Sequence, residues 1–201
     1  MADILVRELT PDLLDEWLHF FDHIAFTDNP DWSGCYCYFY HADHAARDWD
    51  ARDASENRAA SRELIAAGRM KGFLAFAGDQ PVGWVHAAPR LSIPNLHLDP
   101  SLAVGDADQV GSIVCFVIAA PYRRRGIAGA LLRAACDGFH AHGLAVAEAY
   151  PRAAAQGEAS NYHGPMRLYQ EAGFTSFRVC NGMVVVRRAL PAAGRAREPW
   201  T

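Results

Sequence analysis

Hydrophobic positions near the start of the chain change from strand spacing to helix spacing. Residues 4–9 alternate as in a strand, and the apolar residues of 13–21 then recur at helical spacing. Between them, residues 10–12 read Thr-Pro-Asp, a favourable start for a helix. Residues 32–41 are rich in aromatic and cysteine side chains without a clear period, and we expect an ordered loop or short strand there.

A second helix and a hairpin follow. Ser55 is placed to cap the helix and Gly68 to end it. The apolar runs 72–77 and 82–88 flank 78–81, which reads Gly-Asp-Gln-Pro, and this pattern predicts two antiparallel strands joined by a short loop.

The middle of the chain predicts a buried strand followed by an amphipathic helix. Residues 91–110 have no period and predict a long connection, which in a compact domain is often functional. Residues 112–118 form a continuous apolar run typical of a central strand covered on both faces. Apolar residues four apart in 127–139 predict a helix, and 144–150 predict the next strand.

The last elements are a short helix over about 165–172 and two strands, 174–180 and 183–188. Between these strands lies Asn181-Gly182, a strong signal for a two-residue hairpin. The complete order predicts an α/β (α+β mixed sheet) fold with about seven strands and about four flanking helices.

Length, charge and cysteine content narrow the functional class. The 201 residues suit a single domain, which we place at 1–190 with a flexible tail at 191–201. Lys and Arg total 19 against 23 Asp and Glu, a balance that argues against a nucleic-acid partner. We expect no signal peptide or membrane span, and five cysteines, an odd number, favour reduced thiols. A cytoplasmic location is therefore expected.

The turn before the predicted helix at 127–139 has the features of an anion site. Residues 122–129 read Tyr-Arg-Arg-Arg-Gly-Ile-Ala-Gly, so short side chains leave the backbone open beside three arginines. The first amides of a helix lack partners inside it, and the helix dipole favours negative charge there. The segment predicts a pyrophosphate cradle, although a solvated helix cap would also fit these residues alone.

Two segments together resemble the GNAT superfamily of acyl-CoA-dependent N-acetyltransferases. Arg123-x-x-Gly126-x-Ala128 matches the superfamily pattern Q/R-x-x-G-x-G/A and follows a buried strand, as that superfamily requires. Further along, residues 168–174 resemble its second landmark, a short helix that carries Tyr169 and ends in Gly-Phe. The resemblance extends over 4–188 and implies a mostly antiparallel sheet with a central parallel pair.

The resemblance also implies acetyl-CoA as the acyl donor, with no metal required. Pantetheine would lie in a gap between the strands predicted at 112–118 and 144–150, with the pyrophosphate at the following turn. The implied cofactor-binding residues are Val117, Ile118, Arg123, Arg124, Arg125, Gly126, Ile127, Ala128, Gly129, Ala130 and Asn161. Asn161 stands one position further from Tyr169 than is usual in the family.

For catalysis, the resemblance implies that an amine attacks the thioester directly in a ternary complex. Tyr169 would be the general acid for the leaving thiolate; a core tyrosine is the alternative. A base must deprotonate the ammonium unless a water wire does so, and we favour Glu148 over His86 and His163. Cys115 lies within an apolar strand, where a thiol behaves as a small hydrophobe rather than a nucleophile.

The aromatic segment near the N-terminus is open to two interpretations. Trp32, Tyr36, Tyr38 and Tyr40, together with Trp84, either line the acceptor pocket or pack in the core. An aromatic pocket favours a small amine with an apolar body. Cys35, Cys37, His41 and His44 are metal-ligand types without a familiar zinc spacing, so packing is the favoured interpretation.

Three functions therefore remain open. The first is a small-molecule N-acetyltransferase, the second a protein or peptide N-acetyltransferase, and the third a non-catalytic acyl-CoA-binding module. The expected partners are acetyl-CoA and an amine acceptor. A membrane partner is not expected, and a homodimer remains open because family members often pair.

Overall fold

A seven-stranded mixed sheet forms the centre of the computed structural model, which describes residues 3–97, 99–153, 161–180, 182–191 and 200. The strand order is β1-β2-β3-β4-β5-β7-β6, and β4–β5 is the parallel pair in an otherwise antiparallel sheet. The strands are β1 (Ile4–Glu8), β2 (Gly72–Ala77), β3 (Gln80–Pro89), β4 (Val110–Ile118), β5 (Val146–Ala149), β6 (Thr175–Cys180) and β7 (Met183–Ala189). The predicted mixed sheet with a central parallel pair is confirmed.

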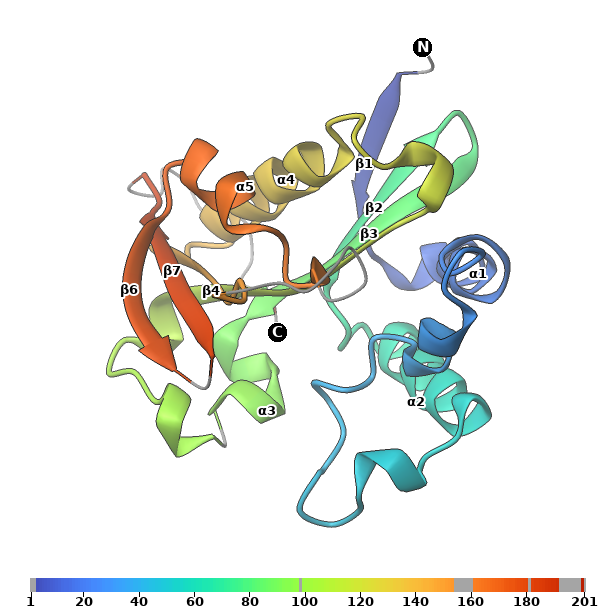
Figure 1. Ribbon diagram of the computed structural model, residues 1–201, viewed down its shortest axis with the longest axis horizontal. Helices are drawn as coiled ribbons and strands as arrows, with labels where there is room; N and C mark the ends of the chain where they lie inside the picture. Colours follow the sequence, from blue (N-terminus) through green and yellow to red (C-terminus); the bar gives the residue numbers. More distant parts are fainter. Residues whose placement is uncertain (1–2, 98, 154–160, 181, 192–199, 201) are drawn as a thin grey trace.

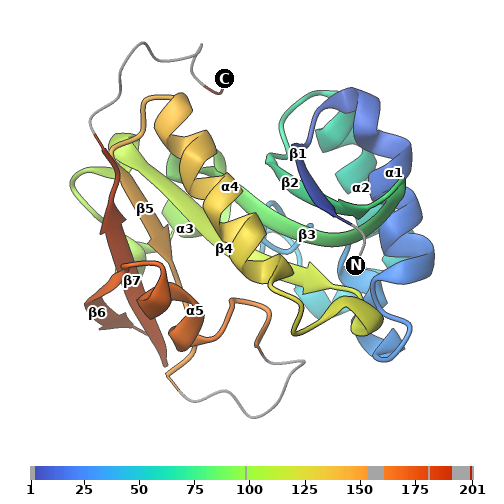
Figure 2. The ribbon, with the colours of Figure 1, turned by 90° about the horizontal axis from the view of Figure 1, so that it is seen from above.

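Helices cover both faces of this sheet. They are α1 (Leu14–His19), α2 (Ala54–Ala66), α3 (Pro94–His97), α4 (Ile127–Ala141) and α5 (Met166–Glu171). α4 and α5 lie on one face, whereas α1 and α2 lie on the other, beside β1–β3 (Figures 1 and 2). None of the helices in the described ranges is both long enough and apolar enough to cross a membrane.

Apolar side chains pack both helix layers against the sheet. On one face, Leu131 and Phe139 of α4 are fully buried in a cluster that includes sheet residues such as Val85. On the other, Trp17 of α1 packs edge-to-face against Trp84 of β3, with ring centroids 6.0 Å apart. These two cores fix the ends of β3 and β4 between the helix layers.

α2 starts two residues earlier than the sequence suggested. The Asp53 carboxylate accepts a hydrogen bond from the Glu56 amide at 2.9 Å, and the Glu56 carboxylate accepts one from the Asp53 amide at 3.0 Å. The prediction of Ser55 as the cap is wrong, because this reciprocal capping box satisfies two amides at once. The Ser55 hydroxyl instead donates to Asp53 at 2.7 Å.

The aromatic segment is an ordered loop and not a strand. It contains the 3-10 turn Pro30–Cys35, after which Tyr36 and Cys37 have φ angles of 45° and 55°. A left-handed backbone cannot continue a β ladder, so the chain turns back at these two residues. Cys37 thereby reaches the buried face of β3, where its sulfur accepts a hydrogen bond from the Trp84 indole.

The connection between β3 and β4 is anchored by a buried arginine. It includes α3 and the 3-10 turn Pro100–Leu102. Nη2 of Arg90 donates to the carbonyl oxygens of Leu96 at 2.9 Å and Leu102 at 2.6 Å. Because Arg90 is only 1% exposed, these bonds hold the connection against the sheet.

Part of the predicted C-terminal region can be placed. Asn181, predicted as a hairpin residue, lies outside the described residues, but Cys180 pairs with Met183 as that hairpin requires. Within the predicted tail, Trp200 stacks on His142 with ring centroids 4.4 Å apart. Its indole also donates to Glu8 at 2.6 Å, so Trp200 is fixed against α4 and β1.

Candidate active site

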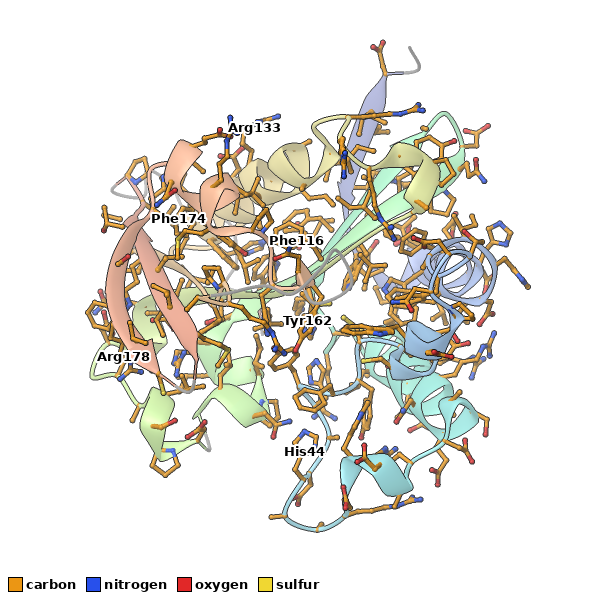
Figure 3. The ribbon with its side chains drawn as sticks, in the orientation of Figure 1. His44, Phe116, Arg133, Tyr162, Phe174 and Arg178 are labelled. Atoms are coloured by element: carbon orange, nitrogen blue, oxygen red, sulfur yellow. The ribbon has the colours of Figure 1, made fainter. Side chains whose placement is uncertain are left out.

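The parallel strands β4 and β5 separate at the middle of the sheet. Their pairing runs from Val110–Val146 to Ile113–Ala149. Beyond that point the Phe116 amide donates to the Tyr162 carbonyl at 2.6 Å. Figure 3 labels Phe116 and Tyr162 at this place, in the centre of the molecule. The predicted gap between the two strands is therefore present. Residues 161–164 lie along part of this gap, beside β4.

A cavity of about 790 Å³ opens where β4 ends. Its wall combines the end of β4, the start of α4, the segment after β5 and the N-terminal aromatic loop. Among its lining residues are Phe116, Val117, Ile118, Arg123, Ala128, Asn161, Tyr162, Gly164, Trp32, Phe39, Tyr40 and Trp49. Val117, Ile118, Arg123, Ala128 and Asn161 were all predicted as cofactor-binding residues, and the structure brings them to one space.

The start of α4 presents backbone amides beside this cavity. Gly126 precedes the helix with φ 80°, and a Cβ atom there would meet only open space. The Ala130 amide donates to the Gly126 carbonyl at 3.0 Å and closes the first turn. The Ala130 amide, which the sequence also suggested for a phosphate, is therefore already used within the helix. The donors that the helix start offers to a phosphate are the three amides before the first helical hydrogen bond, those of Ile127, Ala128 and Gly129.

The arginines before α4 differ in their contacts. Arg123 forms an ion pair with Asp28 at 2.5 Å, and its Nε donates to the Ile118 carbonyl at 3.0 Å. The hydrogen bond from Arg123 lowers the pKa of Asp28. Arg125 lies over the Tyr122 ring, 5.5 Å from its centroid. Arg123 therefore ties the end of β4 to the N-terminal loop.

Tyr169 lies immediately behind the cavity wall. Its side chain is fully buried, and its hydroxyl donates to the His163 carbonyl at 2.5 Å. Gly164 lines the cavity in front of it, and a Cβ atom on Gly164 would stand 3.0 Å from that hydroxyl. Burial raises the pKa of Tyr169 well above its ordinary value, so the hydroxyl keeps its proton at neutral pH.

Glu148 has an environment that does not suit a base. It is fully buried and accepts hydrogen bonds from Arg90 at 2.5 Å, Arg187 at 2.6 Å and Tyr150 at 2.5 Å. Both oxygens of this carboxylate are therefore already engaged by guanidinium groups. Glu148 is also absent from the cavity wall formed by the described residues. This geometry argues against the base role predicted from the sequence and makes Glu148 the centre of a buried ion-pair network.

The two histidines considered as bases are also buried. His163 bonds to the Val114 carbonyl at 2.9 Å, and burial lowers its pKa to about 4. His86 lies 3.3 Å from His41, measured between their Nε2 atoms. Within the described part of the chain, neither His86 nor His163 belongs to the cavity wall.

The aromatic loop supplies only part of the pocket expected from it. Trp32 and Tyr40 line the cavity, whereas Tyr36, Tyr38 and Trp84 do not belong to the described lining. Phe39, Trp49 and Tyr162 line it and were not predicted, because their neighbours in space come from distant parts of the chain. Two carboxylates, Asp31 and Asp50, also border the cavity, together with three arginines, Arg52, Arg123 and Arg152.

The cysteine and histidine set near the N-terminus is divided among separate contacts. Cys37 accepts a hydrogen bond from Trp84, and His44 bonds to the Phe39 carbonyl at 2.9 Å. Among the residues whose placement is described, no three His, Cys, Asp or Glu side chains are grouped to hold a metal ion.

Comparisons with known proteins agree with this architecture. The family model described as Acetyltransferase (GNAT) family matches residues 41–174. The search of curated proteins returned no match. Among solved structures, aminoglycoside acetyltransferase AAC(6')-Ib in complex with coenzyme A superposes with a TM-score of 0.60 at 15% identity, covering 93% of this chain and 95% of that one.

Two further solved structures have the same fold. PaiA N-acetyltransferase of Thermoplasma acidophilum, in complex with coenzyme A, gives a TM-score of 0.55 at 13% identity, covering 93% of this chain and 99% of that one. YncA of Salmonella typhimurium, with its cofactor acetyl-CoA, gives 0.52 at 14% identity, covering 98% and 100%. Since the family model spans more than half of the residues, this chain belongs to the Acetyltransferase (GNAT) family.

Proposed function

We propose that this protein transfers an acetyl group from acetyl-CoA to the primary amine of a small molecule. The observation that carries the proposal is the continuity of one cavity, which joins the end of β4 and the start of α4 to an aromatic loop that carries two carboxylates. A thioester and an amine held in one such space can react directly, because the entropy cost of bringing them together has already been met on binding.

The donor side is supported by the contacts at β4 and α4. The pyrophosphate would accept hydrogen bonds from the amides of residues 127–129 and attract Arg124 and Arg125. Pantetheine would run past Val117 and Ile118 toward Asn161, all of which line the cavity. The coenzyme A and acetyl-CoA complexes of the structural neighbours support this choice of donor.

The acceptor side is supported by aromatic and acidic residues. Trp32, Phe39 and Trp49 offer apolar surface. Asp31 and Asp50 offer carboxylates, in a lining that also contains Arg52 and Arg152. This combination suits a small ammonium compound with an apolar or aromatic body. The bound ammonium must lose a proton before attack, and the two carboxylates are proposed to receive it, directly or through water.

Tyr169 remains our proposed general acid for the thiolate that leaves. Its raised pKa keeps a proton available, and Gly164, which lines the cavity, lies next to its hydroxyl. That hydroxyl donates a hydrogen bond to the His163 carbonyl. Donation to the cofactor sulfur would therefore require this bond to be exchanged. We also place the activity in the cytoplasm, where free thiols such as those of this chain stay reduced.

The test is release of free coenzyme A from acetyl-CoA against a panel of amines. Turnover of an aromatic or alkyl amine, with no turnover of peptides, is the expected result. Asp50→Asn should raise KM for the amine, and Asp137→Asn, which changes an exposed carboxylate of α4 outside the described lining, is the matched control. Tight coenzyme A binding without turnover of any amine would instead identify a binding module, and turnover of peptides alone would identify a peptide acetyltransferase.

A further inference from the structure

Tyr40 of the aromatic loop belongs to the wall of the cavity and is firmly held there. The side-chain amide of Asn95 donates to the carbonyl oxygens of Phe39 at 2.6 Å and Ala42 at 3.0 Å, on either side of Tyr40. The backbone amide of Asn95 also donates to the Tyr40 carbonyl at 3.3 Å. Because Asn95 lies on α3, the connection between β3 and β4 fixes the position of this tyrosine.

The hydroxyl of Tyr40 meets the ring of His163. Its oxygen lies 3.4 Å from Nδ1 of His163, and the same Nδ1 lies 2.9 Å from the carbonyl oxygen of Val114. A carbonyl oxygen can only accept a hydrogen bond, so Nδ1 carries the ring proton and is the donor in both contacts. The Tyr40 oxygen therefore accepts from His163, and the proton of the Tyr40 hydroxyl is not used in this contact.

The proton of the Tyr40 hydroxyl has no acceptor among the residues that the structure describes. Burial raises the pKa of Tyr40 well above its ordinary value, so the hydroxyl keeps this proton at neutral pH. Tyr169 differs, because its proton is already donated to the His163 carbonyl. Since polar groups away from bulk water normally find a partner, a ligand atom in the cavity is the acceptor that Tyr40 lacks.

Tyr40 is tied to the place where β4 leaves both of its neighbours. The register of β4 against β3 shifts between His86 and Ala87, a β-bulge that leaves Val114 without a partner residue. On the other side, pairing of β4 with β5 ends one residue earlier, at Ile113. Because the Val114 carbonyl shares its donor with the Tyr40 hydroxyl, this hydroxyl lies where the gap between β4 and β5 begins.

We propose that the Tyr40 hydroxyl donates a hydrogen bond to the carbonyl oxygen of the bound acetyl thioester, a role that rests on the proposed function. The pyrophosphate is proposed to lie at the start of α4. The thioester, at the other end of the pantetheine, would therefore lie toward the beginning of the gap. Tyr40 is in this way assigned to the acyl oxygen, and Tyr169 remains assigned to the sulfur.

The hydrogen bond would act on the charge that develops during transfer. Attack by the neutral amine forms the C–N bond and moves the carbonyl electron pair onto the oxygen. The carbonyl re-forms as the C–S bond breaks, the nitrogen loses its second proton to the carboxylates or water, and the thiolate takes its proton from Tyr169. A fixed donor strengthens its bond to the oxygen while that oxygen is negative, and this difference lowers the barrier.

Tyr40→Phe tests the role, because it removes the hydroxyl and keeps the ring. The value of kcat should fall roughly 10²–10³-fold, the usual loss for one oxyanion donor, with little change in KM for acetyl-CoA. Tyr38→Phe is the matched control, since Tyr38 belongs to the same loop but not to the described lining, and it should keep its kcat. Full kcat in Tyr40→Phe, or an equal loss in both variants, would overturn the proposal.

A second readout needs no turnover and separates this proposal from the proposed function. Acetyl-CoA that carries a heavy carbon isotope in its acetyl carbonyl is bound to the full chain without an amine, and infrared spectroscopy records the carbonyl stretch. The frequency should be lower in the unchanged chain and in Tyr38→Phe than in Tyr40→Phe. An equal frequency in all three would overturn the role of Tyr40 even where amines are acetylated. A shift that depends on Tyr40, without turnover of any amine, would refute the proposed function and leave this hydrogen bond established.

Discussion

Arg90 and Glu148 form an ion pair of 2.5 Å in which the two side chains are 1% and 0% exposed. Glu148 also pairs with Arg187, so its carboxylate lies between two guanidinium groups. The network connects β5 and β7 to the long connection that follows β3, because Arg90 also binds carbonyl oxygens within that connection.

Glu148→Gln should destabilise the fold by about 3–5 kcal/mol, since it leaves two guanidinium groups beside a neutral amide in the protein interior. Urea unfolding measures this loss. Glu171→Gln is the control, because the Arg167–Glu171 pair is exposed and worth only about 0.3–0.5 kcal/mol. An unchanged unfolding free energy for Glu148→Gln, together with loss of one limb of the pH–kcat profile, would restore Glu148 as the base.

Gly126→Ala should weaken coenzyme A binding. Gly126 has φ 80°, which costs an alanine roughly 1–2 kcal/mol, and relief of that strain would distort the start of α4. Gly173→Ala introduces the same strain at φ 81° after α5, also with open space around the added Cβ atom. The two variants should therefore have similar stability. Calorimetry should show weaker coenzyme A binding for Gly126→Ala than for Gly173→Ala. Equal affinities in both would remove the cofactor role assigned to the α4 start.

Tyr169→Phe should lower kcat by roughly 10²–10⁴ if its hydroxyl protonates the leaving thiolate. KM for acetyl-CoA should change little, because the ring and its packing against Phe174 remain. Steady-state kinetics measure both quantities. Tyr122→Phe, which removes a hydroxyl that bonds to Gln80 near the surface, is the matched control. Retention of full kcat by Tyr169→Phe would make Tyr169 a core residue.

Acid should destabilise the protein partly through His163. Its pKa is lowered to about 4 by burial, from an ordinary value of 6.5, so the unfolded chain binds more protons between these two values. The stability is complete above pH 6.5 and is lost as the pH falls toward 4, with a slope of at most roughly 1.4 kcal/mol per pH unit. Urea unfolding from pH 7 to 4 measures this slope. His163→Gln should reduce it, and an unchanged slope would contradict the assignment.

The sheet and the cofactor side of the site could be predicted because their signals are local. Apolar runs on either side of a short turn mark β2 and β3, and the turn before α4 carries its glycine and arginines within a few adjacent residues. The resemblance to the GNAT superfamily then implied the separated parallel pair. At α2 the predicted cap, Ser55, was wrong because Asp53, two residues earlier, accepts a hydrogen bond from the Glu56 amide.

The chemistry of the interior could not be predicted in the same way. Arg90 and Glu148 are 58 residues apart, and no local pattern indicates that they pair. The same holds for Trp49 and Tyr162, which reach the cavity from separate loops. Which side chains meet in the interior depends on the complete fold. Strand spacing alone therefore could not show that Glu148, the predicted base, is buried in the interior.

The position of Trp200 has a practical consequence for attaching this protein to other molecules. Trp200 contacts Phe139 and His142 at the C-terminal end of α4, whereas Ala128 borders the cavity at the opposite end. Fifteen residues of helix separate these ends by about 22 Å. A fluorescent label or solid support joined just beyond Trp200 would thus leave the entrance used by the reactants unobstructed.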